Sequence, residues 1–172
     1  MSKLKSLQEI SSIVSRLKRS GKKVVFTNGC FDILHVGHVR YLRQAKALGD
    51  ILVLGLNRDA SVKALNKGSG RPETHEKERA EVLGALEAVD YLVLFGERTP
   101  EKLIRAIKPD FLVKGGDWKK ENIAGAAFVE SYGGKALSLR FVKGYSTTKL
   151  IDKIFAAKRD ESAGIFGGKE TT

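Results

Sequence analysis

The sequence predicts an α/β protein built on an open, parallel, five-stranded sheet of the Rossmann-like type, with helices on both faces. Short apolar runs alternate with helical stretches along most of the 172 residues. The runs are nearly uninterrupted, as expected for strands that are covered on both faces. Parallel strands need crossover connections, which are usually helical, so the alternation indicates βαβ units around a single sheet.

Each element follows from a local pattern. Residues 4–19 carry apolar side chains at helical spacing and stop before Gly21, which predicts an N-terminal helix. Strands are predicted at VVFTN, ILVLGLN, YLVLF, FLVK and ALSLRFV, which are residues 24–28, 51–57, 91–95, 111–114 and 136–142. Helices are predicted at residues 37–48, 75–88, 100–107, 122–132 and 147–157. The chain thus divides into an N-terminal helix (1–21), a main domain (22–157) and a tail (158–172) whose charges and glycines predict flexibility.

The composition limits the possible compartments and partners. A formal charge of +11, from 31 Lys+Arg against 20 Asp+Glu, favours phosphate-rich ligands. The basic residues are scattered and no aromatics are interleaved with them, so we expect no specific nucleic-acid partner. One cysteine, Cys30, excludes an internal disulfide framework. The chain shows neither a secretory signal nor the roughly 20 apolar residues that span a bilayer, so we expect a cytoplasmic protein without membrane contact.

The segment after the first strand carries the strongest chemical signal. His35 and His38 lie three residues apart across Gly37, and this spacing places both side chains on one face of the helix that begins there. A helix start offers unpaired N–H groups and a positive dipole end to an anion. Two imidazoles above it can donate to a phosphate in its transition state, and one such donor is worth about 3–4 kcal/mol. Gly37, which lacks a Cβ, would let a base or ribose approach the backbone.

Two other interpretations of the histidines stay open. They could be metal ligands, although zinc usually takes a third protein ligand, for which the sequence offers only His75, Cys30 and Asp32. They could also be two unrelated surface residues. Neither alternative explains why Thr27, Asn28 and Gly29 end the preceding strand with small and polar side chains.

The segment TNGCFDILHVGHVRYLRQAKALGD, with its T/HxGH turn between a strand and a helix, resembles the cytidylyltransferase-like nucleotidyltransferases. The resemblance continues in order through GLNRDASVKAL, RPETHEKER, LGALEAVDYLVLF, TPEKLIRAIKPDFLVKGGDW and STTKLIDKI, and covers residues 22–155. It implies a fold of the HxGH nucleotidyltransferase type, with 22–157 as the nucleotidyltransferase domain. LGALEAVD, LVKGGDW and STT are most similar to the D-glycero-β-D-manno-heptose 1-phosphate adenylyltransferases. Members of that subfamily are often fused behind a sugar kinase, and we expect the free-standing form here.

That resemblance implies transfer of AMP from ATP to the heptose 1-phosphate, giving ADP-heptose and pyrophosphate for lipopolysaccharide core biosynthesis. Mg²⁺ would be bound through the ATP phosphates rather than in a protein site. The partners would be ATP and a sugar 1-phosphate, and we expect a homodimer. A glycerol-3-phosphate cytidylyltransferase or an FMN adenylyltransferase is the alternative. Glu87 stands where the glycerol-phosphate and choline-phosphate relatives have a basic residue, which argues against those relatives.

The resemblance also assigns the site residues. Catalysis falls to His35, His38, Lys67 and Arg71, the last two being cations of a Gly-rich loop that could otherwise be solvated charges. Nucleotide contacts are expected from Thr27, Asn28, Gly29, Phe31, Asp32, Gly37, Asn57, Arg79, Lys114, Gly116, Asp117, Trp118, Ser146, Thr147 and Thr148. Some of these have a structural alternative: Phe31 as core, Asp32 as a helix cap, and Ser146–Thr148 as the N-cap of the last helix.

Overall fold

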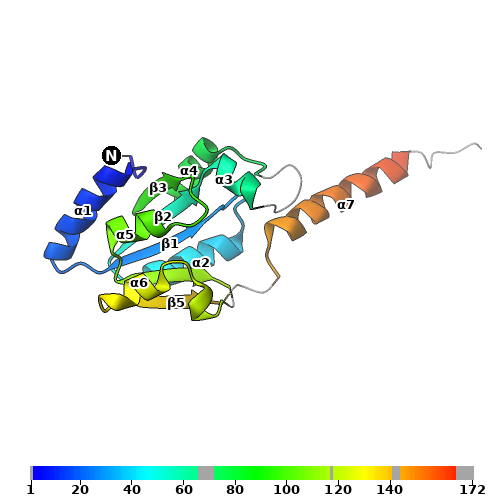
Figure 1. Ribbon diagram of the computed structural model, residues 1–172. Coiled ribbons are helices and arrows are strands. Elements are labelled where there is room, and N and C mark those ends of the chain that lie inside the picture. The colour runs from blue at the N-terminus through cyan, green and yellow to red at the C-terminus, as the bar shows by residue number, and fades with distance from the viewer. Residues whose placement is uncertain (1, 66–71, 117, 141–143, 166–172) are drawn as a thin grey trace, which may run out of the picture.

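The sheet of this computed structural model confirms the predicted architecture (Figure 1). The structure describes residues 2–65, 72–116, 118–140 and 144–165, with side chains up to residue 157. Five strands pair in the order β3-β2-β1-β4-β5, and every pairing is parallel. They are β1 (Val24–Gly29), β2 (Ile51–Asn57), β3 (Tyr91–Phe95), β4 (Phe111–Gly115) and β5 (Lys135–Leu139). The strand order reverses between β1 and β4, and ligands of such sheets bind at this switch point.

The helices depart from the predicted ranges in four places. They are α1 (Leu7–Arg19), α2 (Val36–Lys46), α3 (Asp59–Ala64), α4 (Glu76–Gly84), α5 (Glu101–Ile107), α6 (Ala126–Ser131) and α7 (Thr147–Ile165), with a short 3₁₀ turn at Lys120–Asn122. The six-residue α3 was not predicted, because it is too short for an apolar periodicity. The predicted helix 75–88 ends early, at Gly84, and 122–132 divides into the 3₁₀ turn and α6. The last helix runs eight residues beyond the predicted 157.

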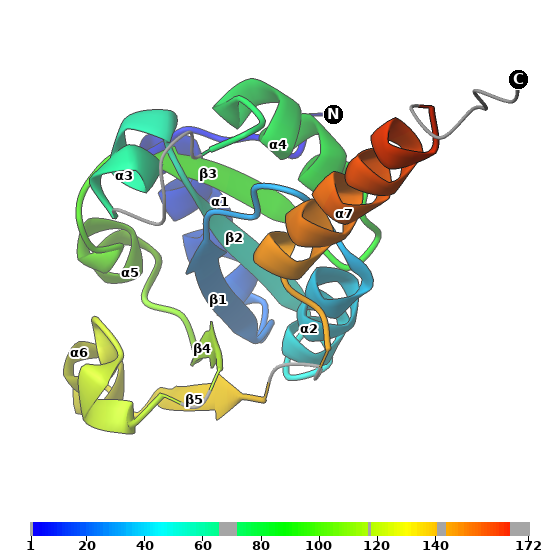
Figure 2. The same cartoon turned by 90° about the vertical axis from the view of Figure 1, so that its right-hand side faces the viewer.

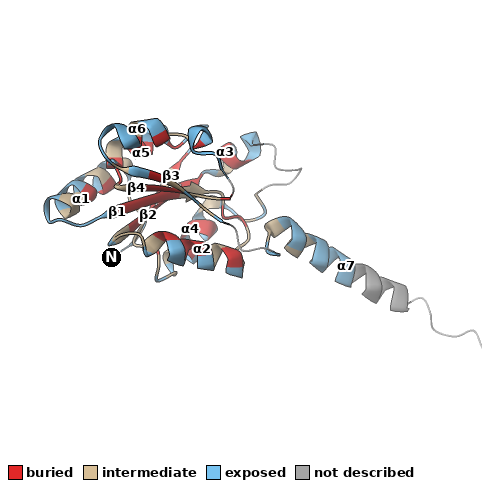
Figure 3. Cartoon of the chain, turned by 90° about the horizontal axis from the view of Figure 1, so that it is seen from below, coloured by how far each residue is buried: buried red, intermediate tan, exposed pale blue. Residues whose placement is uncertain are grey.

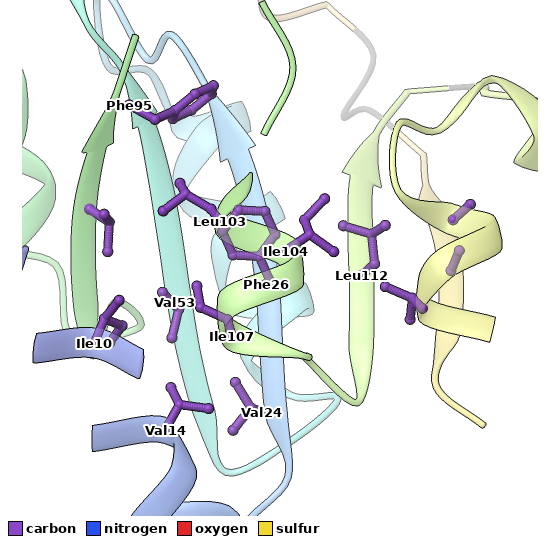
Figure 4. Close-up of a cluster of buried hydrophobic side chains, with 14 of the residues drawn as sticks. Ile10, Val14, Val24, Phe26, Val53, Phe95, Leu103, Ile104, Ile107 and Leu112 are labelled. Carbon is purple, nitrogen blue, oxygen red and sulfur yellow. The ribbon is translucent and has the colours of Figure 1, made fainter. Parts of the chain in front are cut away.

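Two apolar cores lie on the two faces of the sheet, as the uninterrupted strands predicted (Figure 3). Helices α1, α5 and α6 cover one face, where Ile10, Ile104 and Phe26 belong to one buried cluster (Figure 4). Helices α2 and α4 cover the other face, where Leu42 and Leu83 are fully buried. Burying a leucine side chain contributes about 1.5–3 kcal/mol, so these layers hold the strand ends in place.

Three aspartates, each just before a strand, fix the register of the sheet. Each carboxylate accepts the backbone N–H at the start of the neighbouring strand: Asp50 from Lys23 at 2.8 Å, Asp110 from Val24 at 2.9 Å and Asp90 from Leu52 at 2.6 Å. These amides would otherwise lack a partner at the sheet end. The N–H of Lys23 and the hydrogen bond from Lys22 hold the pKa of Asp50 below its usual range.

Both ends of the described chain lie outside the central layers. The N-terminal segment pairs with the edge strand β3, since Lys5 N donates to Leu92 O at 2.8 Å and Leu92 N to Lys3 O at 2.9 Å, which covers an exposed strand edge. Helix α1 follows, with a capping box between Ser6 and Glu9. Helix α7 projects away from the body (Figures 1 and 3). Among the described helices, none combines the length and apolarity needed to cross a membrane.

Candidate active site

The two histidines lie at the carboxyl end of β1, beside the switch point of the sheet. His35 is the N-cap of α2, and its carbonyl accepts the N–H of His38 at 2.9 Å. Its side chain makes no capping hydrogen bond, and the first turn of α2 contains no acidic residue. The positive end of an 11-residue helix is therefore left uncompensated within the described chain, directly beneath the two imidazoles. This arrangement favours an anion.

The two imidazole rings are stacked. Their centroids are 3.8 Å apart and their planes differ by 17°, while Phe31 packs against His38 with ring centroids 5.2 Å apart. Burial, and secondarily the neighbouring His35, lowers the pKa of His38 to about 4; burial also lowers that of His35. The buried Nδ1 of each ring has no hydrogen-bond partner among the described residues. Both rings are thus neutral near pH 7.

The depressed pKa of His38 predicts that stability falls in mild acid. Because this pKa is about 4 in the folded protein against 6.5 for a free side chain, the unfolded chain binds more protons between these values. Stability is therefore retained above about pH 6.5 and is lost as the pH falls toward about 4. We expect the Tm of the wild type to fall between about pH 7 and about pH 5, and the Tm of His38→Gln to fall by less. Thermal unfolding of both proteins at the two pH values measures this difference. An equal loss in both proteins would show that His38 does not titrate as described.

Two glycines leave room for the rings of this site. A Cβ on Gly29 would lie 2.8 Å from Cε2 of Phe31, and one on Gly37 would lie 2.9 Å from Nδ1 of His35 and 3.2 Å from Cβ of Tyr145. A side chain at position 37 would therefore crowd His35 and Tyr145, so the close packing here requires glycine. Phe31 itself is 7% exposed and belongs to a core cluster, with φ at +47°. Phe31 packs against the ring of His38 and presents little surface to a nucleotide.

Thr27 is also placed differently from the expectation. It was predicted to contact nucleotide phosphates, but it is fully buried and its Oγ1 lies 2.5 Å from the hydroxyl of Tyr41 on α2. The Tyr41 hydroxyl also donates to Val113 O in β4 at 3.4 Å. Burial raises the pKa of Tyr41 to about 12, with the Thr27 hydrogen bond opposing it. These contacts join α2, the helix that carries the histidines, to the central strands β1 and β4. Thr27 therefore contributes to the site by holding α2 in place.

Asp32 lies in the loop between β1 and α2 and is neither a cap of α2 nor a partner of the histidines in the contacts described. Its Oδ1 accepts the backbone N–H of Glu73 at 2.8 Å and that of Thr74 at 3.1 Å, and Thr74 Oγ1 donates to Asp32 O at 2.5 Å. The carboxylate therefore fastens the loop that carries His35 to the start of α4. Asp32 thereby helps to position the loop that leads to the histidines.

Arg79 holds three segments of the site together and does not face solvent. Its side chain is 1% exposed, and it donates to Thr74 O at 3.0 Å, Cys30 O at 2.6 Å and Asn57 O at 2.9 Å. A fourth bond, at 2.7 Å, pairs it with Asp59. Burial opposes the ionisation of Asp59, but the hydrogen bonds that its carboxylate accepts from Arg79 and from the backbone of Glu76 outweigh burial and lower its pKa. This corrects the expectation of a phosphate-binding arginine.

The remaining strand ends bring polar side chains toward the switch point. Asn57 is buried and donates to Ser61 Oγ at 3.1 Å, so it shapes the turn into α3. Asn28, at the end of β1, accepts from Lys114 Nζ at 3.2 Å across the gap between β1 and β4. Lys114 also lies 5.9 Å from the ring of Trp118. Lys114, one of the cations that the sequence predicted for the site, therefore lies at the switch point between β1 and β4.

The loop after β4 presents an aromatic side chain. Trp118 is 47% exposed, and its indole N–H donates to Gly115 O at 3.0 Å. Gly116 has φ at +115°, a conformation that only glycine adopts readily, and its N–H donates to Leu139 O at 2.8 Å. Trp118 thus presents exposed aromatic surface beside Lys114. Asp117 lies outside the described residues.

The start of α7 lies beside the loop that follows β1 (Figure 2). Ser146 Oγ accepts the N–H of Lys149 at 3.1 Å, so it caps the helix as expected. Thr147 Oγ1 donates to Ile33 O at 3.5 Å, which ties the helix start to the loop after β1, and Thr148 is exposed. The predicted loop cations Lys67 and Arg71 lie outside the described residues. Sequence reasoning missed Tyr145, Tyr41 and Asp59, because no local pattern reveals contacts across the chain.

A metal centre built only from protein ligands finds no support among the described side chains. They contain no group of three or more His, Cys, Asp or Glu residues that could hold an ion. His75, the third histidine of the chain, caps α4 with an 84% exposed side chain, and Cys30 lies at the end of β1 with Arg79 on its carbonyl. What the site offers is neutral donors, a helix end and hydroxyl groups, and these suit phosphate.

A parallel sheet whose central strand passes through a His-x-Gly-His turn into a helix defines the α/β nucleotidyltransferase fold. The sequence pattern of the cytidylyltransferase-like family matches residues 26–153. The chain therefore belongs to the cytidylyltransferase-like family.

Curated relatives are similar over nearly the whole chain. A bifunctional protein HldE of Geobacter metallireducens is 55% identical over 159 residues, which are 92% of this chain and 32% of that protein. The HldE of Sulfurimonas denitrificans is 54% identical over 151 residues, 88% of this chain and 31% of that protein. The chain thus spans about a third of the length of the curated relatives it matches.

Two solved structures share the fold. The lipopolysaccharide core biosynthesis protein of Thermoplasma volcanium is 32% identical with a TM-score of 0.60, over 73% of this chain and all of that one. A pantoate-beta-alanine ligase of Francisella tularensis, solved with an ATP analogue and beta-alanine, has a TM-score of 0.57 over 92% of this chain and 80% of its own. At 15% identity, that second likeness shows the fold alone.

Proposed function

We propose that this protein transfers AMP from ATP to D-glycero-β-D-manno-heptose 1-phosphate, releasing pyrophosphate and giving ADP-heptose for lipopolysaccharide core biosynthesis. The observation that carries the proposal is the stacked, neutral pair of His35 and His38 above the open start of α2. The identity to the HldE relatives and the likeness to a lipopolysaccharide core biosynthesis protein support the choice of acceptor.

In this reaction an oxygen of the sugar phosphate attacks the α-phosphorus of ATP in line. The bond from the α-phosphorus to the bridging oxygen of the β-phosphate breaks, and pyrophosphate leaves with both electrons. No covalent enzyme intermediate is needed, so catalysis consists of positioning and charge stabilisation. Each neutral imidazole has one N–H to donate to the charge that develops on the α-phosphate and the leaving group.

Other residues would hold the nucleotide. The hydroxyl groups of Ser146–Thr148 and the start of α7 suit the triphosphate, while Lys114 and the exposed face of Trp118 suit the ribose and base. Lys67 and Arg71 would bind phosphate from the Gly-rich loop. Mg²⁺ would be carried by the ATP phosphates, where it would supply charge neutralisation. We further propose a cytoplasmic location and a homodimer.

The choice of nucleotide tests this proposal. Pyrophosphate release with heptose 1-phosphate should give a kcat/KM for ATP at least about tenfold above that for CTP, a difference of about 1.4 kcal/mol. The reason is the match of LGALEAVD and LVKGGDW to the heptose enzymes, with Glu87 in place of a basic residue. Equal values for the two nucleotides would reject the heptose assignment, although the family would stand.

A further inference from the structure

A second cavity opens on the same edge of the sheet, away from the histidines. It has a volume of about 660 Å³ and lies at the carboxyl end of β3, between the segment before α1 and the start of α5. In the strand order β3-β2-β1-β4-β5, this position is two strands away from β1, which leads to His35. Small-molecule sites measure about 300–1,000 Å³, so the cavity is large enough for a metabolite.

The wall of this cavity is largely apolar. Leu7, Leu94, Phe95 and Leu103 contribute to it, and Phe95 and Leu103 belong to the core cluster on the α1 and α5 side of the sheet (Figure 4). Leu4, which also lines the cavity, is 40% exposed. Apolar surface left open to solvent in a concavity gains free energy when an apolar group covers it.

The rim of the cavity is positively charged. Its charged lining residues are Lys5, Arg58, Lys102 and Glu97, and Glu76 pairs with Arg58 from outside the lining, which leaves three positive charges against two negative. Arg58 donates one hydrogen bond to Glu76 at 2.8 Å, but a guanidinium carries five N–H donors. Lys102 lies 3.5 Å from Glu97, with both side chains about half exposed or more, so that pair is weak. For Lys5, no ion pair is found within the described chain.

We propose that this cavity is a second binding site, which takes an organic anion with an apolar or aromatic body. The anionic group would lie between Lys5, Arg58 and Lys102, and the body would cover Leu94 and Phe95. This site lies beyond the activity proposed above and does not depend on it, because no residue of the cavity belongs to the histidine site.

Gly96 allows the cavity to be filled without disturbing the fold. A Cβ at this position would meet only Cδ of Arg58, at 3.5 Å, which is an ordinary contact. Gly96→Phe should therefore fold and occupy the cavity. A second approach removes charge instead, through Lys5→Met and Lys102→Met. Lys135→Met, at an exposed lysine at the start of β5, is the matched control.

The experiment is a fluorescence titration of the purified chain with 1-naphthyl phosphate. We expect saturable binding of one probe per chain, weakened about two- to fivefold by each cation variant, unchanged in Lys135→Met and abolished in Gly96→Phe. Inorganic phosphate and neutral 1-naphthol should each bind more weakly, because each uses only one half of the site. Phe155→Ser, which removes a 62% exposed aromatic on α7, should leave the titration unchanged.

Three results would overturn the proposal. The first is the absence of saturable binding, and the second is an unchanged titration in Gly96→Phe. The third is binding of 1-naphthol as tight as that of 1-naphthyl phosphate, because it would show that the cations play no role. Sedimentation of the same samples adds a fourth test. If Gly96→Phe converted a dimer into a monomer, the surface would belong to a second copy of the chain and not to a small molecule.

Discussion

Replacing either histidine of the stacked pair with alanine is expected to lower kcat by about 10²–10³ while changing Tm little. The rings contribute hydrogen-bond donors at the open start of α2, and the buried Nδ1 atoms have no partner among the described residues whose loss would destabilise the fold. Single-turnover measurements of pyrophosphate release would separate this effect from product release.

His75→Ala is the matched control, because this third histidine is 84% exposed and caps another helix. It should keep wild-type kcat. A His35→Ala or His38→Ala variant that loses folded protein, while the remaining fraction retains normal specific activity, would make the pair structural and would remove the basis of the proposed mechanism.

Arg79→Met is expected to destabilise the protein by about 3 kcal/mol or more. The substitution removes four hydrogen bonds, among them those to the carbonyls of Cys30 and Asn57, and takes the guanidinium away from Asp59. For a domain of this size, Tm should fall by about 6–12 °C. Thermal unfolding monitored by circular dichroism measures this directly.

Arg98→Met serves as the control, since Arg98 is exposed and no partner is described for it. It should shift Tm by less than about 2 °C. The competing role for Arg79, phosphate binding, makes a different prediction. An Arg79→Met protein with unchanged Tm and a raised KM for ATP would restore the arginine as a ligand of the nucleotide and would contradict its position here.

The fold could be predicted from sequence because its determinants are local and repeated. Each strand is an apolar run, and each predicted crossover carries a helical pattern, so β1 to β5 were found with only small changes at their ends. The errors have physical causes. Helix α3 is six residues long, which is too short for an apolar periodicity, and the helix predicted at 75–88 stops at Gly84, ahead of the Asp90 carboxylate that accepts the N–H of Leu52.

The site could be predicted only in part, for the same reason. His35, His38 and the hydroxyls at the start of α7 sit on helix ends, which a motif locates well. Thr27 and Arg79 have the right chemistry for phosphate, but their partners are Tyr41 and carbonyls of distant segments. A motif shows that a polar residue is near a site; it does not show whether that residue faces inward.

The product formed from ATP and D-glycero-β-D-manno-heptose 1-phosphate is the most direct test of the proposed activity. A reaction followed by ³¹P NMR, with glycerol 3-phosphate and FMN as parallel acceptors, resolves sugar diphosphate, pyrophosphate and orthophosphate. The account predicts equal amounts of ADP-heptose and pyrophosphate with the heptose, no turnover of the other two acceptors, and loss of both products in His38→Ala. Consumption of the heptose phosphate without a new diphosphate, or faster turnover of FMN or glycerol 3-phosphate, would contradict it.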